Sequence, residues 1–307
     1  MRPSQLLLFV AASTVQAQLR PNNETICDFY SKLLLGASNA TTQLTLLTLL
    51  VNTAVIGNYT QPNHNAVPGI LAKDATFNGT KVNLVPYFSG ALKSTNVGKD
   101  HGVAVNFLDG GGAAPLAESK PANSLASHQG ILLTKLYSYF GVLLACSDIG
   151  KEGFPAYNGE TSMYTTHKYM ALDSYEVGYF IEQVGLAAAS FGVEAADVTL
   201  VGYTLQGYFG NKCAKPTSVM DKWKKEQQSI CITDDCPDAS GAVCDAYPKV
   251  VEPAANGTES HSDMTSPASA GNGTAAPTAA GKNAGATLQV SLALTTLMAG
   301  VLAFLLT

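Results

Sequence analysis

The chain has 307 residues, 46% of them hydrophobic, and a formal net charge of −5 with 13% charged residues. This length is sufficient for at least one domain with a substantial core. The slightly negative charge and the lack of a basic stripe give no support to nucleic-acid binding, so we expect no nucleic-acid partner.

The N-terminus has the features of a secretory signal. Arg2 precedes an apolar run from Leu6 to Ala12, and Val15-Gln16-Ala17 forms a small-residue cleavage site. The run is too short to span a bilayer, which favours a cleaved signal over an anchor. We therefore expect residues 1–17 to be a signal peptide and the secreted chain to begin at Gln18.

The segment 18–213 reads as one mostly helical body. The first helix is predicted over 26–35 and the second over 41–56, whereas residues 57–122 are rich in Gly, Asn and Pro and predict irregular structure. A third helix is predicted over 125–146, with an apolar face. The inward residues of this helix would be Leu132, Leu133, Leu136, Tyr139, Phe140 and Leu143.

Two further helices complete the predicted body. Asp173 and Glu176 form a capping pair for a helix over 174–191, which Gly192 ends. Its apolar residues recur at three- and four-residue steps, so one face should be buried. A last helix is predicted over 195–209, with Val198, Leu205 and Phe209 on one face.

Three C-terminal segments follow the body. Residues 214–251 carry clustered cysteines and predict a small disulfide-rich extension. Residues 252–287 are rich in Ala, Gly, Pro, Ser and Thr, which is typical of an extended stalk. Residues 288–307 contain no charge, and no Lys or Arg follows them.

Small residues, a polar spacer and an apolar tail together are typical of a GPI-attachment signal, whose tail is removed. We expect attachment at Asn272 or Asn283, and a protein held on the outer leaflet of the plasma membrane, with the cell wall as a second location. A tail-anchored helix over 288–307 is the alternative.

Modification sites agree with a secreted, glycosylated surface protein. The Asn-x-Ser/Thr sequons are at Asn23, Asn39, Asn58, Asn78, Asn256 and Asn272. Six cysteines on an oxidising route predict disulfides. We expect Cys27 to pair with Cys146, and two bridges among Cys213, Cys231, Cys236 and Cys244. A zinc site is not expected, because no Cys-x-x-Cys occurs.

Several short motifs follow one another along the body. Asp28-Phe29-Tyr30 lies in the first helix, and Tyr87-Phe88-Ser89-Gly90 lies in the irregular region. Leu125 and Gln129 open the third helix. Tyr157-Asn158-Gly159 precedes Met163 and, four residues later, His167. Phe191-Gly192-Val193 ends the next helix.

In this order the motifs resemble the truncated haemoglobins. The resemblance covers residues 27–35, 82–90 and 125–213. Both intervening stretches are longer than in that family, and the Tyr-x-Gly to His spacing carries one extra residue. The resemblance implies an all-α, globin-like helical sandwich with long inserted loops, and haem (heme) as cofactor.

The resemblance also implies a role for each motif residue. His167 would be the proximal iron ligand, and Tyr30 and Gln129 would donate hydrogen bonds to an iron-bound diatomic gas. Phe88 would pack on the porphyrin. The remaining pocket residues would be Leu125, Leu132, Leu133 and Met163, and His128 could contact a haem propionate.

Plainer interpretations remain beside these roles. Tyr30 could be a core aromatic with a bonded hydroxyl, and Gln129 a solvated helix residue. The alternative function is a non-catalytic glycosylated surface or wall protein whose globin-like helices lack a cofactor. A secreted hydrolase is a weaker option, because neither Gly-x-Ser-x-Gly nor His-Glu-x-x-His occurs. We assign no catalytic residue and leave enzymatic activity open.

Overall fold

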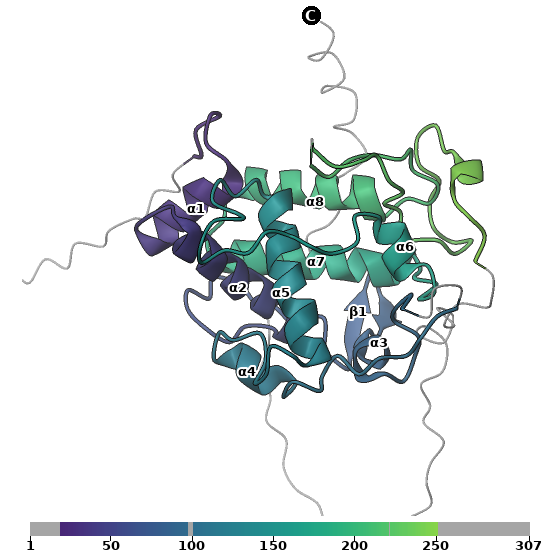
Figure 1. The fold of residues 1–307 in the computed structure, drawn as a ribbon, viewed down its shortest axis with the longest axis horizontal. Helices are drawn as coiled ribbons and strands as arrows, with labels where there is room; N and C mark the ends of the chain where they lie inside the picture. The colour runs from purple at the N-terminus through teal and green to yellow at the C-terminus, as the bar shows by residue number, and fades with distance from the viewer. Residues whose placement is uncertain (1–18, 98–100, 221, 251–307) are drawn as a thin grey trace, which may run out of the picture. The chain divides into compact units, whose positions relative to one another are not determined.

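The computed structural model describes residues 19–97, 101–220 and 222–250, and Figure 1 shows their arrangement. This part of the chain forms eight α-helices and one β-hairpin. The predicted mainly helical class is therefore confirmed. The predicted signal peptide, stalk and GPI tail, with Asn256, Asn272 and Asn283, lie outside the described residues.

The first two helices form where the sequence predicts them. Helix α1 (Ile26–Leu35) begins after Thr25, whose side chain accepts a hydrogen bond from the Asp28 backbone. Helix α2 (Ala40–Ile56) begins after Asn39, which forms a reciprocal capping box with Thr42. These two helices pack against each other.

The region expected to be irregular contains a hairpin and two short helices. Strands β1 (Ala75–Phe77) and β2 (Thr80–Val82) pair antiparallel around Asn78-Gly79. Both turn residues have positive φ, 50° and 81°, which is why Asn-Gly favours such a tight turn. Helices α3 (Val85–Ser89) and α4 (Ala113–Ala117) follow.

Helix α5 (His128–Leu143) is shorter than the predicted 125–146. The Ser127 side chain accepts a hydrogen bond from the Gly130 backbone and so sets the start of the helix. Leu125 therefore lies outside the helix and is 66% exposed, which excludes it from the apolar pocket that the sequence assigned to it.

The two helices predicted after residue 170 are confirmed. A short helix that was not predicted, α6 (Met163–His167), precedes them. Helix α7 (Ser174–Ser190) begins at the predicted capping box of Asp173 and Glu176, and α8 (Ala195–Phe209) has the predicted bounds. In Figure 1, α7 and α8 run side by side, and α5 crosses in front of them.

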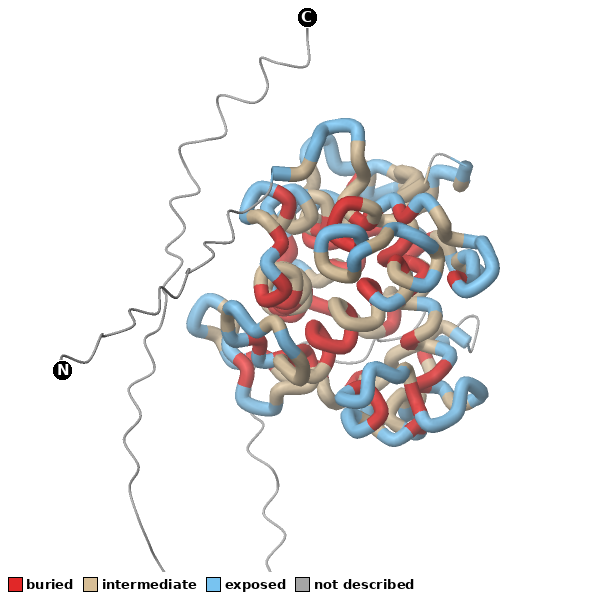
Figure 2. Tube along the Cα trace, turned by 90° about the vertical axis from the view of Figure 1, so that its left-hand side faces the viewer, coloured by how far each residue is buried: buried red, intermediate tan, exposed pale blue. Residues whose placement is uncertain are grey.

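The cysteine-rich extension belongs to the same core as the helices. Figure 2 shows the buried segments gathered in the interior, with the exposed loops around them. Ile230, Cys231 and Cys236 are part of this core, and the backbone N–H groups of Ile230 and Cys231 donate to the carbonyl of Phe209. The described residues of the extension, 214–220 and 222–250, thus pack on the body and include the short 3-10 helix η1 (Cys244–Ala246).

Three disulfides join the described cysteines. Cys27 bonds to Cys146, as the sequence predicts, and so ties the start of α1 to the segment after α5. The last four cysteines form Cys213–Cys244 and Cys231–Cys236. In the described part of the chain, no single helix is long and apolar enough to cross a membrane.

Candidate functional site

A cavity of about 560 Å³ lies inside the helical body. Side chains from α3, α5, α6, α7 and the extension line it, and most of them are apolar or aromatic. Its volume falls in the range of small-molecule binding sites, about 300–1,000 Å³. We therefore take this cavity as the candidate site.

The His167 side chain borders the cavity in one defined orientation. Its Nδ1 lies 2.8 Å from the backbone carbonyl oxygen of Met163, one helical turn earlier. A ring N–H at Nδ1 can donate to this carbonyl, which leaves the lone pair on Nε2.

Enclosure by protein lowers the pKa of His167, and the hydrogen bond to Met163 opposes this effect only in part. His167 is only partly exposed, and it lines the cavity. Burial disfavours the imidazolium, so the neutral form predominates at pH 7. His167 thus has the protonation state of a metal ligand.

Several of the predicted pocket residues meet in this cavity. Phe88 on α3, Leu132 on α5 and Met163 on α6 line it together with His167. Val177 and Phe180 on α7 complete this apolar wall. The structure thus brings together segments that lie far apart in the sequence.

Helix α5 faces the cavity with a stripe that includes four of the six residues predicted to point inward, Leu132, Leu136, Tyr139 and Phe140. Its cavity-lining residues are His128, Ile131, Leu132, Lys135, Leu136, Tyr139 and Phe140. They recur at three- and four-residue steps, the spacing of one helical face. Gln129 and Leu133 are not among the residues that line the cavity. Their assignment to the pocket is therefore corrected.

The Gln129 side chain is buried and fully engaged in another place. Its Nε2 donates to the carbonyl oxygens of Gly112 and Pro121 at 2.9 and 3.0 Å, and its Oε1 accepts from the Gly112 backbone at 2.8 Å. These bonds fix the loop that precedes α5. Gln129 is thus neither a solvated residue nor a donor in the cavity. Leu133 packs in the core.

Tyr30 is also absent from the cavity with His167. Its hydroxyl donates to Asp197 Oδ2 at 2.9 Å and accepts from the Glu194 backbone at 3.0 Å. Arg20 pairs with the same carboxylate at 2.7 Å. The Tyr30 ring borders a separate apolar cavity of about 60 Å³. The expected distal role is therefore corrected: Tyr30 is a core aromatic with a bonded hydroxyl.

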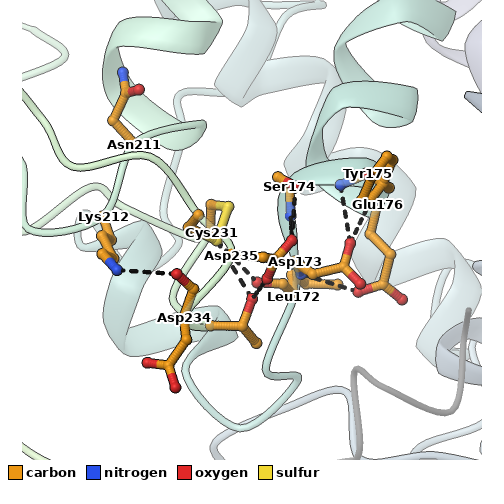
Figure 3. The surroundings of a disulfide bond; sticks show 12 residues. Leu172, Asp173, Ser174, Tyr175, Glu176, Asn211, Lys212, Cys231, Asp234 and Asp235 are labelled. Carbon is orange, nitrogen blue, oxygen red and sulfur yellow. Dashed lines mark hydrogen bonds between the residues drawn. A yellow bond between two sulfur atoms is a disulfide. The ribbon is translucent and has the colours of Figure 1, made fainter. Parts of the chain in front are cut away.

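The extension supports the corner that follows His167, and Figure 3 shows this region. Asp235 accepts hydrogen bonds from the backbone and hydroxyl of Ser174 at 3.2 and 2.7 Å. The Ile232 backbone donates to the carbonyl of Leu172, which lines the cavity. The Cys231–Cys236 disulfide closes the loop that makes these contacts.

Among the described residues, no group of three or more His, Cys, Asp or Glu side chains could hold a metal ion alone. Haem imposes a different requirement, because its porphyrin supplies four ligands and the protein supplies an axial one. Two histidines line the cavity, the enclosed His167 and the exposed His128.

Comparison with known proteins provides no relative. No protein-family model, curated protein or solved structure matches the chain. The cavity and the side chains around it are therefore the guide to function.

Proposed function

We propose that the chain is a haem-binding protein, with haem in the 560 Å³ cavity and His167 Nε2 as the axial iron ligand. The observation that carries this proposal is the hydrogen bond from His167 to the Met163 carbonyl. This bond selects the tautomer and orients the ring, as the partners of metal-bound histidines commonly do.

The other residues of the cavity suit a flat, apolar cofactor. Phe88, Leu132, Met163 and Val177 offer apolar surface from four different elements. Burial of this surface against a porphyrin would supply binding energy and exclude water from the iron. When bound, haem would supply an iron centre able to bind a diatomic gas.

The structure gives more support to haem binding than to gas binding through Tyr30 and Gln129, the two donors predicted from the sequence. The polar atoms of Tyr30 and Gln129 are engaged outside the cavity. Neither could polarise a gas bound beside His167. We therefore place haem retention first and leave gas binding as an activity that other cavity residues would have to support.

We also propose that the protein acts at the cell surface, tethered by a GPI anchor. The proposal rests on the signal and tail sequences, and the three disulfides suit an oxidising compartment. The exposed sequons Asn23, Asn39 and Asn78 can carry glycans. Asn58 is the exception, because the Nδ2 atom that would carry a glycan is buried in this fold.

An absorption spectrum tests the haem proposal. Purified protein with added haem should give a Soret band that shifts from that of free haem and saturates at one haem per chain. His167→Ala should remove the band or leave loosely held haem. The matched control is His64→Ala, because His64 is exposed and does not line the cavity, so its band should equal the parent's.

Two results would contradict the proposal. If the parent shows no saturable Soret band, the alternative of a surface protein without cofactor takes its place. If His167→Ala binds haem with the affinity and spectrum of the parent, His167 is not the ligand. Circular dichroism of each variant separates these outcomes from unfolding.

A further inference from the structure

The wall of the cavity contains a buried phenol, the hydroxyl of Tyr139. Tyr139 lies on α5, lines the cavity and is only 5% exposed. Its hydroxyl is buried and has no hydrogen-bond partner among the described residues. A buried phenol without a partner is costly, so this group calls for an explanation.

Other buried tyrosines show how unusual this is. Each of three donates its hydroxyl to a defined acceptor. The pairs are Tyr87 with the Met170 carbonyl at 3.0 Å, Tyr137 with Asn52 Oδ1 at 2.6 Å, and Tyr179 with the Gly69 carbonyl at 2.8 Å. The fold thus satisfies buried phenols routinely, but leaves one donor beside the cavity without an acceptor.

Lys135 is a second donor on the same wall. It precedes Tyr139 by four residues, so the two side chains are neighbours on one face of α5. Lys135 also lines the cavity, is exposed, and makes no ion pair with a described residue. An ammonium at the exposed side and a phenol at the buried side therefore lie one turn apart.

We propose that Lys135 and Tyr139 bind a carboxylate of the molecule that occupies the cavity. A carboxylate accepts from both donors, and its charge is compensated by the ammonium. The ligand class is an amphipathic acid, with an apolar body in the cavity and an acidic group at this end. The inference rests on the proposed function in taking this cavity as the binding site, but it does not require iron.

Tyr139 can serve as such a donor at neutral pH. Burial raises the pKa of Tyr139 above its usual value, and the neighbouring Tyr157 and Tyr208 add to this effect. The phenol therefore keeps its proton.

Metal-free protoporphyrin IX and its dimethyl ester test the proposal without iron. The free acid keeps both carboxylates and the ester masks them, while the ring is the same. Fluorescence titration of the full chain should show the free acid binding about tenfold tighter than the ester, a factor that corresponds to about 1.4 kcal/mol. This preference should fall towards one in Tyr139→Phe and in Lys135→Met.

Tyr137→Phe is the matched control on the same helix, because its hydroxyl bonds to Asn52 and it does not line the cavity. It should lower the melting temperature of the ligand-free protein and keep the preference for the acid. Tyr139→Phe should show the reverse, with a melting temperature equal to or above the parent's. Failure of Tyr139→Phe to change the preference would overturn the role of this hydroxyl.

The remaining outcomes separate this proposal from the haem proposal. His167→Ala should keep the preference for the acid, because no iron is present. Equal affinity for acid and ester, or no binding of either, overturns the carboxylate site even if His167 binds haem. Competition by oleate, but not by methyl oleate, also supports the carboxylate site and shows that a fatty acid can occupy it as well as a porphyrin.

Discussion

The two walls of the cavity differ in how closely they follow the sequence motifs. On the α6 side, Met163 and His167 lie one turn apart and both line the cavity, as predicted. On the α5 side, Leu132 lines the cavity but Gln129 and Leu133 do not, and Tyr30 of α1 takes part in another network. A motif within one helical turn is positioned by local geometry, whereas partners from separate helices depend on how those helices rotate and pack.

The largest expected effect concerns the two disulfides that hold these walls. Replacing Cys27 and Cys146 together with Ala opens a loop with a sequence separation of 119. In the chain-entropy model this lowers the free energy of unfolding by about 5 kcal/mol. Removing Cys231 and Cys236, only 5 residues apart, should cost about 2 kcal/mol. Urea unfolding measures both.

Removal of the Cys231–Cys236 disulfide should cost less stability than removal of Cys27–Cys146, but it should weaken haem binding more. The Cys231–Cys236 loop supports Leu172 and the start of α7, next to His167, so its removal should weaken haem binding more than removal of the other disulfide. Haem titrations at a temperature where both variants are folded check this. If haem affinity follows overall stability instead, the extension does not act through the His167 wall.

A smaller effect is expected for Tyr30→Phe. This change removes the hydroxyl that donates to Asp197 and accepts from the Glu194 backbone. Loss of a buried hydrogen bond to a charged group should cost about 1.5–3 kcal/mol of unfolding free energy. The haem spectrum and the oxygen dissociation rate should stay those of the parent, because Tyr30 does not line the cavity with His167. A faster oxygen release would restore the distal role that the sequence suggested.

The sequence predicts those features that depend on short segments. Asp173 with Glu176 predicted the start of α7, and helical periodicity predicted α8. The hairpin around Asn78-Gly79 was missed, although Asn-Gly is a turn signal that could have revealed it.

Helical spacing also predicted the apolar part of the α5 stripe, Leu132, Leu136, Tyr139 and Phe140, whereas its polar members His128 and Lys135 follow the same spacing but were not assigned to it. The contacts of Tyr30 could not be predicted in this way, because they depend on Asp197 in a helix near the far end of the body. Nothing local in either segment specifies that pairing.

The smallest effect is the acid sensitivity of the Arg20, Asp197 and Tyr30 network. Burial opposes ionisation of Asp197, but the hydrogen bonds from Arg20 and Tyr30 prevail and hold its pKa below the usual range. Burial also raises the pKa of Tyr30 to about 12, so Tyr30 remains a donor. Because the folded state holds the Asp197 proton less tightly than the unfolded state, this contribution to stability is fully present well above the unfolded value of about 3.9.

The contribution should therefore be lost as the pH falls through about 4 and below. Asp197→Asn keeps the shape of the side chain but cannot ionise, so it should be less stable than the parent at pH 7 and approach the parent at pH 3. Urea unfolding of the ligand-free protein across this pH range gives the difference between the two. A difference that does not change with pH would mean that Asp197 stabilises the fold through packing alone. In that case the charge of Asp197 would not be what holds the Tyr30 hydroxyl in its network. The position of Tyr30 outside the cavity that Met163 and His167 line would then need another explanation.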